Sequence, residues 1–271
     1  MRYVYLNGEY PLETAASISI NDRGFLYGDG VFSSLKVDEG KIEFFSSHIK
    51  RLTTSCQELG IEMPAIDKKL VEQLITLNNA RQGLWRLKII LTAGDCHEIL
   101  LHPRKGCLLI TLKPEKPSKK EVLKIIFFPY PLIKPTSKIK SLAYLDRLHI
   151  RQYALDNGFD DALTMDQYGN LLETSFSNVF WVMGSEIFFP DPSLPFLQGV
   201  TLMELISSLN NQGFIASPIK ISLNDLPENA YLFTINAIQG ILPVDCIGER
   251  IFPLDLSLLN KLQQALKAHI N

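Results

Sequence analysis

The feature that most constrains the fold is a short segment near the middle of the chain, residues 113–120, with the sequence KPEKPSKK. It is rich in proline and lysine and has no large apolar side chain, so it cannot join a hydrophobic core. At 271 residues the chain also exceeds the usual size of a single core. We therefore predict two α+β domains, residues 1–115 and 121–271, with a linker at about 113–120 and a cleft between them.

Apolar periodicity and turn residues locate the expected elements. In the first half we expect a helix capped by Ser46 or Ser47 that ends at Gly60, and a second helix over about 67–79. The strands expected there are 31–37, its hairpin partner 42–45, 85–92 and 107–112. The helices expected in the second half are 144–157, 201–211 and 256–269, the last one capped by Asp255. The strands expected there are 122–128, 162–165, 178–183, 187–189, 215–221, 231–235 and 241–246.

Composition narrows the classes of function. The net charge is -2 with no basic block, which argues against a nucleic-acid partner. The N-terminus lacks the pattern of a secretory signal, and no apolar run approaches the roughly 18 to 20 residues that a membrane span needs. Neither the five histidines nor the cysteines, Cys56, Cys96, Cys107 and Cys246, have the spacing of a metal site or a disulfide framework. We expect a cytoplasmic protein with reduced thiols that acts on a small molecule.

Two charged residues of the second half are candidates for catalysis. Lys140 lies in the segment SKIKSLAYL, and Glu173 follows further along in LETS. A lysine can carry an aldehyde cofactor as a Schiff base. Lys138 is an equal candidate on spacing alone, because a separation of two places both lysines on the same side of a strand. Most single lysines are solvated surface charges, so the choice needs support from the rest of the chain.

Three further segments could bind an anion. Arg51 could grip a phosphate in bidentate fashion, although helical spacing alone favours a solvated charge. Residues 199–201 start a helix whose free N–H groups suit an anion, unless this is an ordinary start with a threonine cap. The turn at 236–237 could supply more amide donors or be a plain connection. With Lys140 and Glu173, these groups match what a pyridoxal phosphate enzyme needs.

The chain resembles the fold-type IV pyridoxal phosphate enzymes, or class IV aminotransferase family. This family includes branched-chain aminotransferases, D-amino acid aminotransferases and 4-amino-4-deoxychorismate lyases. The motifs that carry the resemblance are, in order, DRG with YGDGVF at 22–32, HxxRL at 48–52, KSL at 140–142, ETSxxNVF at 173–180 and xGVT at 198–201. The resemblance implies a D-amino acid aminotransferase-like fold with pyridoxal 5'-phosphate in the interdomain cleft, and a homodimer.

The resemblance also implies roles for individual residues. Lys140, which directly precedes Ser-Leu as in the family motif, would form the internal aldimine, and Lys138 would be a surface charge. Glu173 would pair with the pyridine nitrogen. The other positions implied to hold the cofactor are Arg51, Leu197, Val200, Thr201, Asn236 and Ala237. Phe32 and Lys88 are candidates for substrate contacts, and an outward-facing strand lysine is the alternative for Lys88.

Departures from the family pattern separate its members. Transaminases usually have arginine directly after Gly-Ile/Val-Thr, where this chain has Leu202, and glutamate after the Gly-Asp-Gly-Val-Phe motif, where it has Ser33. The segment 236–244, NAIQGILPV, is similar to the lyase form. These features favour a lyase of the folate route that converts 4-amino-4-deoxychorismate to 4-aminobenzoate and pyruvate. The alternatives are a branched-chain or D-amino acid transaminase and a non-catalytic binding protein, and Lys140 with Glu173 argues against the last.

Other departures affect the surroundings of the site. Ala143 stands where the family commonly has asparagine, and Phe176 replaces a small residue beside the cofactor loop, where it could narrow the site. The arginine-glycine pair usual after Thr92-Ala93-Gly94 is missing. The contacts to the substrate carboxylates therefore differ from the family pattern.

Overall fold

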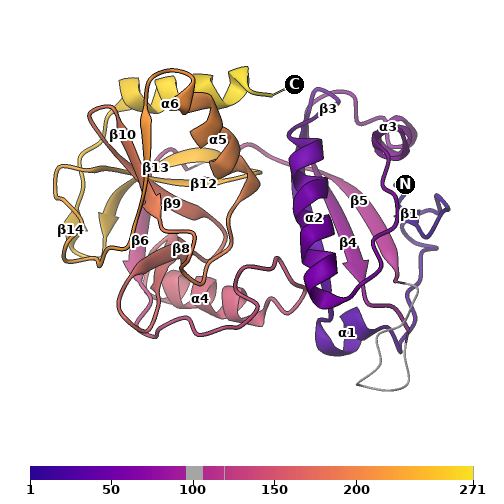
Figure 1. The fold of residues 1–271 in the computed structure, drawn as a ribbon. Coiled ribbons are helices and arrows are strands. Elements are labelled where there is room, and N and C mark those ends of the chain that lie inside the picture. The colour runs from indigo at the N-terminus through magenta and orange to yellow at the C-terminus, as the bar shows by residue number, and fades with distance from the viewer. Residues whose placement is uncertain (96–105, 119, 271) are drawn as a thin grey trace. The chain divides into compact units, whose positions relative to one another are not determined.

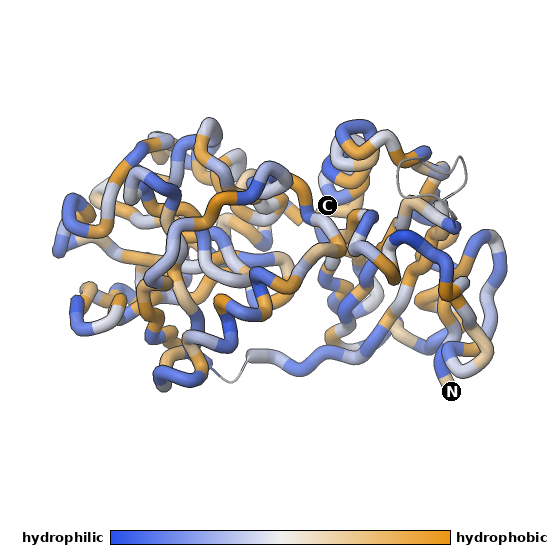
Figure 2. The backbone as a smooth tube through the Cα atoms, turned by 90° about the horizontal axis from the view of Figure 1, so that it is seen from below, coloured by the Kyte–Doolittle hydropathy of each residue, from blue (hydrophilic) through white to orange (hydrophobic). Residues whose placement is uncertain are grey.

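The computed structural model describes residues 1–95, 106–118 and 120–270. The chain divides into two compact units (Figure 1). The first comprises Met1–Pro117 and Ile139–Tyr144, and the second comprises Ser118–Lys138 and Leu145–Asn271. The first crossing, after Pro117, falls in the hydrophilic segment that the sequence suggested as a linker (Figure 2).

The segment Ile139–Tyr144 belongs to the first unit because backbone hydrogen bonds join it to a strand there. Phe32 N donates to Lys140 O at 2.9 Å, and Leu142 N donates to Gly30 O at 2.9 Å. Lys140 therefore groups with the first unit, whereas the sequence placed it in the C-terminal domain. The local pattern around Lys140 could not reveal this, because its partners lie far away in the chain.

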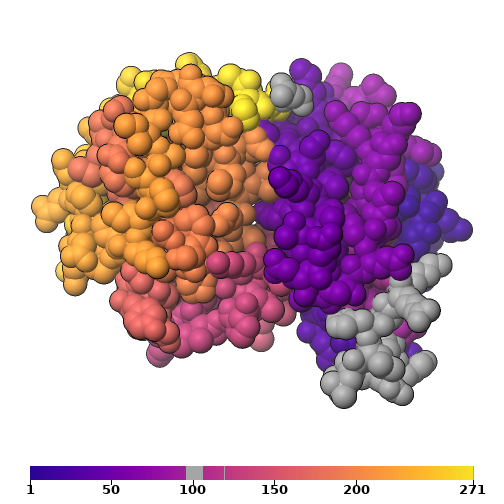
Figure 3. Space-filling view, in the orientation of Figure 1, coloured from indigo at the N-terminus to yellow at the C-terminus, as the bar shows by residue number. Residues whose placement is uncertain are grey.

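The first unit contains an antiparallel sheet with the order β1-β5-β4-β2-β3. Its elements are β1 (Tyr5–Leu6), α1 (Arg23–Tyr27), β2 (Gly30–Asp38), β3 (Lys41–Ile42), α2 (Phe45–Leu59), α3 (Lys68–Leu77), β4 (Leu84–Thr92) and β5 (Leu108–Pro114). Apolar side chains of β2, β4 and β5 form a buried core with those of α2 and α3. The opposite side of α2 lies at the surface of this unit (Figure 3).

Helix α2 begins earlier than the sequence suggested. Its N-cap is Phe44, which has a φ of 51° and makes no side-chain cap hydrogen bond, so the prediction of a cap at Ser46 or Ser47 is wrong. The left-handed turn at Phe44 also ends the expected hairpin partner early, because β3 covers only Lys41–Ile42. The predicted end at Gly60 is confirmed, with a φ of 66° that suits glycine.

The second unit contains a mixed sheet with the order β11-β10-β9-β12-β13-β6-β7-β8, and β14 pairs with β13. Its elements are β6 (Leu123–Phe127), α4 (Leu145–Asp156), β7 (Asp161–Met165), β8 (Leu171–Thr174), β9 (Asn178–Met183), β10 (Glu186–Pro190), α5 (Val200–Asn210), β11 (Ile215–Ile219), β12 (Tyr231–Asn236), β13 (Gly240–Ile247), β14 (Arg250–Ile251) and α6 (Leu256–Ala268). Helix α4 shares a core with β7 and β8, and Ser208 Oγ of α5 donates to Ala265 O of α6 at 2.7 Å.

The predicted α+β fold class is confirmed by this mixture of sheets and helices in each unit. The cap of α6 is confirmed as well, because the Asp255 carboxylate accepts from Leu258 N at 2.9 Å. Two elements that contain motif residues were not expected. Helix α1 lies within the first glycine-containing motif, and β8 is a short strand that carries Glu173.

Other expectations concerned membranes, metals and thiols. In the described part of the chain, no helix has both the length and the apolar character that crossing a bilayer requires. The same residues hold no group of three or more His, Cys, Asp and Glu side chains arranged to bind a metal ion. Cys56, Cys107 and Cys246 are free thiols, and Cys96 lies outside the described residues.

Candidate active site

Two glycines in the first motif make room for the segment that carries Lys140. A Cβ on Gly30 would lie 2.6 Å from Leu91 O and 2.7 Å from Leu142 Cδ1. Gly28 has a φ of 68°, and a Cβ there would lie 2.9 Å from the backbone of Ala143. Both contacts are too short for any side chain, so the motif is needed for the close approach of β2 and residues 139–144.

The Lys140 side chain lies among aromatic rings of the first unit. Its Nζ is 4.9 Å from the centre of the Phe32 ring and 5.6 Å from that of Tyr144, and the two rings meet edge to face at 5.2 Å. Lys88 Nζ lies 4.5 Å from the centre of the same Phe32 ring. Lys88 is therefore partly buried beside Phe32 rather than a strand lysine that points into solvent.

Partial burial also affects the pKa of Lys88. Desolvation lowers the pKa of its amino group, and the positive charges of Arg86 and Lys113 lower it further. Lys138 lies in different surroundings. Its side chain is exposed and its Nζ donates to Pro192 O at 2.9 Å in the second unit.

Arg51 of α2 is embedded in the first unit without an acidic partner. Its Nη2 donates to Ser33 Oγ at 2.7 Å, and Ser33 Oγ lies 2.8 Å from Nδ1 of the buried His48. Among the described residues, no carboxylate forms an ion pair with Arg51. Desolvation lowers the pKa of Arg51 to about 10, an effect that Tyr144 opposes. The interpretation as a solvated helix charge is therefore not supported, and the guanidinium is suited to bind an external anion.

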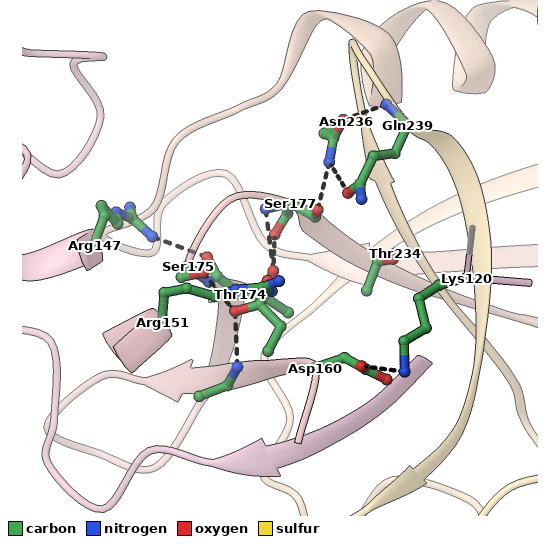
Figure 4. Close-up of polar contacts among 12 residues, drawn as sticks. Lys120, Arg147, Arg151, Asp160, Thr174, Ser175, Ser177, Thr234, Asn236 and Gln239 are labelled. Carbon is green, nitrogen blue, oxygen red and sulfur yellow. Dashed lines mark hydrogen bonds and ion pairs between the residues drawn. The ribbon is translucent and has the colours of Figure 1, made fainter. Parts of the chain in front are cut away.

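Glu173 lies at the end of β8 and is held by two donors on the same oxygen. Arg147 of α4 forms an ion pair with its Oε1, and Leu197 N donates to Oε1 at 2.9 Å. Arg147 Nη1 also donates to Thr174 O at 3.1 Å (Figure 4). Sequence reasoning missed Arg147, because an arginine early in a polar helix is ordinary.

A second arginine of α4 fixes the residues after Glu173. Arg151 Nη1 lies 3.4 Å from Asp161 Oδ2, and Asp161 Oδ1 accepts from Ser175 N at 3.2 Å and from Ser175 Oγ at 2.5 Å. Figure 4 shows both arginines pointing from α4 toward this segment. Arg151 also lies 5.9 Å from the centre of the Phe176 ring. These contacts tie the residues after Glu173 to α4 and β7.

The amide of Asn178 positions the start of α5. Its Nδ2 donates to Leu197 O at 2.7 Å, and its Oδ1 accepts from Gly199 N at 2.9 Å. A Cβ on Gly199 would lie only 2.0 Å from Asn178 Oδ1, so glycine is required. Gly199 is the N-cap of α5 and makes no side-chain cap bond, so a cap at Thr201 is excluded. The first backbone N–H groups of α5 have no side-chain acceptor at this cap.

The turn between β12 and β13 is organised by the Asn236 side chain. Its Oδ1 accepts from Ile238 N at 2.9 Å and from Gln239 N at 2.8 Å. Its Nδ2 donates to Ser177 Oγ at 2.9 Å, which joins the turn to the segment after β8 (Figure 4). The sequence analysis named Asn236 as a cofactor position, but it did not single out Asn178, although Asn178 lies in the ETSxxNVF motif.

The candidate residues are distributed over both units. The first unit holds Phe32, Arg51, Lys88 and Lys140, of which Phe32, Lys88 and Lys140 cluster together. The second unit holds Glu173, Leu197, Val200, Thr201, Asn236 and Ala237. Within the second unit, hydrogen bonds connect Glu173 of β8 to Leu197, which lies shortly before α5, and Ser177 to the turn before β13.

Known proteins similar to this chain include both transaminases and lyases. A protein of Methanocaldococcus jannaschii that carries the name of a branched-chain-amino-acid aminotransferase is 28% identical over 260 residues, which cover 92% of this chain and 88% of the relative. The aminodeoxychorismate lyase of Bacillus subtilis is 26% identical over 254 residues, 91% of this chain and 87% of the relative.

Solved structures that are similar to this chain include a lyase. The 4-amino-4-deoxychorismate lyase from Pseudomonas aeruginosa is similar with a TM-score of 0.82 and 25% identity, over 98% of this chain and 98% of that chain. The family model for amino-transferase class IV matches residues 30–247. This match includes the segment of Lys140, the Glu173 motif and the start of α5. The chain therefore belongs to the class IV aminotransferases, a family of pyridoxal phosphate-dependent enzymes.

Proposed function

We propose that the protein is a lyase that converts 4-amino-4-deoxychorismate to 4-aminobenzoate and pyruvate on the folate route. The observation that carries this proposal is Leu202 in the first turns of α5. Where transaminases of the family usually have an arginine, this side chain is apolar and only 2% exposed. Position 202 therefore offers no cation to an amino-acid carboxylate. The similarity to the Bacillus subtilis lyase supports the same activity.

The side chains present fit the chemical groups of pyridoxal phosphate. Arg51 is an embedded cation without a described acidic partner, which suits the phosphate. The start of α5 at Val200 and Thr201 and the turn at Asn236-Ala237 add uncharged donors. Glu173 presents a buried carboxylate for the ring nitrogen, and Leu197 an apolar side chain for the ring face.

The proposed reaction assigns proton transfers to Lys140. The bound cofactor supplies the electron sink for charge that develops on the substrate carbon. Lys140 Nζ removes the proton from the amine-bearing ring carbon and donates one to the departing enolpyruvyl oxygen. The carbon–oxygen bond breaks, the ring becomes aromatic, and the amino group stays on the product. Phe32 would border the substrate, and Lys88 would bind one of its carboxylates.

The test is an assay of the purified protein with 4-amino-4-deoxychorismate, made from chorismate and glutamine by a partner synthase. We expect 4-aminobenzoate and pyruvate in equal amounts. Lys140→Ala should abolish both products, since it removes the proton-transferring group, while the control Lys138→Ala should keep wild-type activity. Glutamate formation from amino donors and 2-oxoglutarate without 4-aminobenzoate would replace this proposal with a transaminase, the activity that the name of the Methanocaldococcus jannaschii relative favours.

The alternative of a non-catalytic binding protein has its own test. A binding protein that kept only the fold would show no visible absorbance from bound cofactor and no lysine adduct after borohydride reduction.

We propose further that the enzyme works in the cytoplasm as a homodimer. Exposed apolar side chains between residues 18 and 27 of the first unit support the dimer.

A further inference from the structure

Two side chains with no assigned role lie against Arg51. Ser33 belongs to β2 and His48 to α2, one helical turn before Arg51. Ser33 is 0% exposed and His48 is 1% exposed. Ser33 Oγ contacts both Arg51 Nη2, at 2.7 Å, and His48 Nδ1, at 2.8 Å. The serine hydroxyl is therefore the link between the arginine and the histidine.

The directions of these hydrogen bonds follow from what each group can donate. A guanidinium only donates, so Ser33 Oγ accepts from Arg51. The hydroxyl hydrogen of Ser33 is then free to point at His48 Nδ1, which places the ring hydrogen of a neutral His48 on Nε2. This direction leaves one buried group unpaired, the Nε2 hydrogen, whereas the opposite direction would leave two, the Ser33 hydroxyl hydrogen and the Nε2 lone pair, at a greater cost in free energy. His48 Nε2 itself has no hydrogen-bond partner among the described residues.

The local electrostatics favour the neutral form of His48. Desolvation lowers the pKa of His48 well below its ordinary value, and the charges of Arg51 and Lys140 lower it further. Transaminases of the family usually have glutamate where this chain has Ser33. A carboxylate at that position would lie against the guanidinium and neutralise it. Serine supports Arg51 by a hydrogen bond and leaves its positive charge uncompensated.

We propose that Ser33 and neutral His48 are positioning residues that hold Arg51 toward the cofactor phosphate while preserving its full charge. This inference rests on the proposed role of Arg51 in binding the phosphate. Ser33 fixes the guanidinium through its oxygen, and His48 fixes the direction of the Ser33 hydroxyl. Neither residue contacts the reacting atoms in this arrangement.

The experiment compares the affinity of the full-length apoprotein for pyridoxal phosphate and for pyridoxal, which lacks the phosphate. Both are titrated by cofactor absorbance. Ser33→Ala should weaken binding of pyridoxal phosphate about tenfold, the effect of losing one hydrogen bond to a charged group. Its affinity for pyridoxal should stay unchanged. Ser33→Thr keeps the hydroxyl and should bind like wild type. Ser34→Ala, on the opposite side of β2, is the matched control and should keep the wild-type ratio of the two affinities.

Each other outcome has a defined meaning. If Ser33→Ala binds pyridoxal phosphate like wild type, or loses affinity for both compounds equally, or if Ser33→Thr behaves like the alanine variant, the positioning role is wrong. If the wild-type protein itself does not prefer pyridoxal phosphate to pyridoxal, the proposed phosphate role of Arg51 fails and this inference fails with it. The contradicting results for the Ser33 variants would not affect the proposed role of Arg51 itself.

The tautomer of His48 gives a second test that needs no cofactor. Nitrogen-15 NMR of the wild-type apoprotein, with His48→Gln to assign the signal, should show a neutral ring with its hydrogen on Nε2 at neutral pH. Ser33→Ala should lose this preference, because the partner of Nδ1 is removed. A hydrogen on Nδ1, or a charged ring, in the wild-type protein would contradict the proposal.

Discussion

His48 shows how the surroundings of one side chain set its charge. The ring is enclosed between β2 and α2, where water does not solvate an imidazolium, and two cations act on it. In an unfolded chain the same ring would bind a proton at its ordinary pKa of 6.5. Folding therefore excludes a proton that the unfolded state binds as soon as the solution becomes mildly acidic.

This difference predicts an acid-sensitive stability. As the pH falls below 6.5, the ordinary pKa of His48, the unfolded state gains a proton that the folded state does not. The free energy of unfolding should then fall by up to about 1.4 kcal/mol per pH unit from this residue. Urea unfolding of the wild type and of His48→Gln between neutral and mildly acidic pH measures the effect. The glutamine variant should lose this contribution, and parallel curves for the two proteins would refute it.

For individual residues, the sequence predicted a role only where the residue belongs to a family motif. Lys140 and Lys138 were equal on spacing, and the structure distinguishes their surroundings, with aromatic rings around one and exposure for the other. Ser33, read as a simple departure from the family, is in contact with Arg51. That contact depends on how β2 packs against α2, which no local pattern contains.

At the scale of elements, α4 uses one face to hold the segment after β8. Arg147 and Arg151 are one turn apart, so both side chains extend from the same side of the helix. Arg147 pairs with Glu173, and Arg151 with Asp161, which in turn holds Ser175. The helix thus positions a carboxylate and the backbone that follows it.

The ion pair between Arg147 of α4 and Glu173 of β8 should show strong coupling in the free energy of unfolding. The two side chains are 13% and 6% exposed, so Arg147→Met would leave the Glu173 carboxylate buried without its cation. We expect the free energy of unfolding to fall by about 3 kcal/mol. The double variant with Glu173→Gln should be less destabilised than the sum of the single variants, as urea unfolding of all four proteins would show. Additive losses would mean that the two residues act independently.

Predicting elements from the sequence succeeded where the pattern was local and failed where it was not. The end of α2 at Gly60 and the Asp255 cap of α6 follow from residues next to those positions. The start of α2 at Phe44 instead depends on a left-handed turn of a bulky residue that the surrounding fold imposes. Strand β8 was missed because it is short and buried throughout, so it shows no alternation.

For the whole molecule, the proposed dimer can be tested through the exposed apolar side chains of residues 18–27. These are Ile18, Ile20, Phe25, Leu26 and Tyr27. Sedimentation equilibrium should give twice the chain mass of 30.6 kDa, and Phe25→Ser should shift the protein toward monomer by weakening an apolar contact. Tyr168→Ser, which alters an exposed ring of the second unit, should not change the mass. A wild-type protein that sediments as a single chain at every concentration would exclude the dimer.

The return of residues 139–144 to the first unit has a consequence for folding during synthesis. When Pro117 leaves the ribosome, the first unit still lacks the segment that pairs with β2. Residues 118–138, which belong to the second unit, emerge before that segment does. The N-terminal unit therefore cannot complete its fold when Pro117 emerges and has to wait for residues 139–144, whereas residues 145–271 of the second unit emerge later still. The proposed catalytic lysine is part of the last segment that the unit receives.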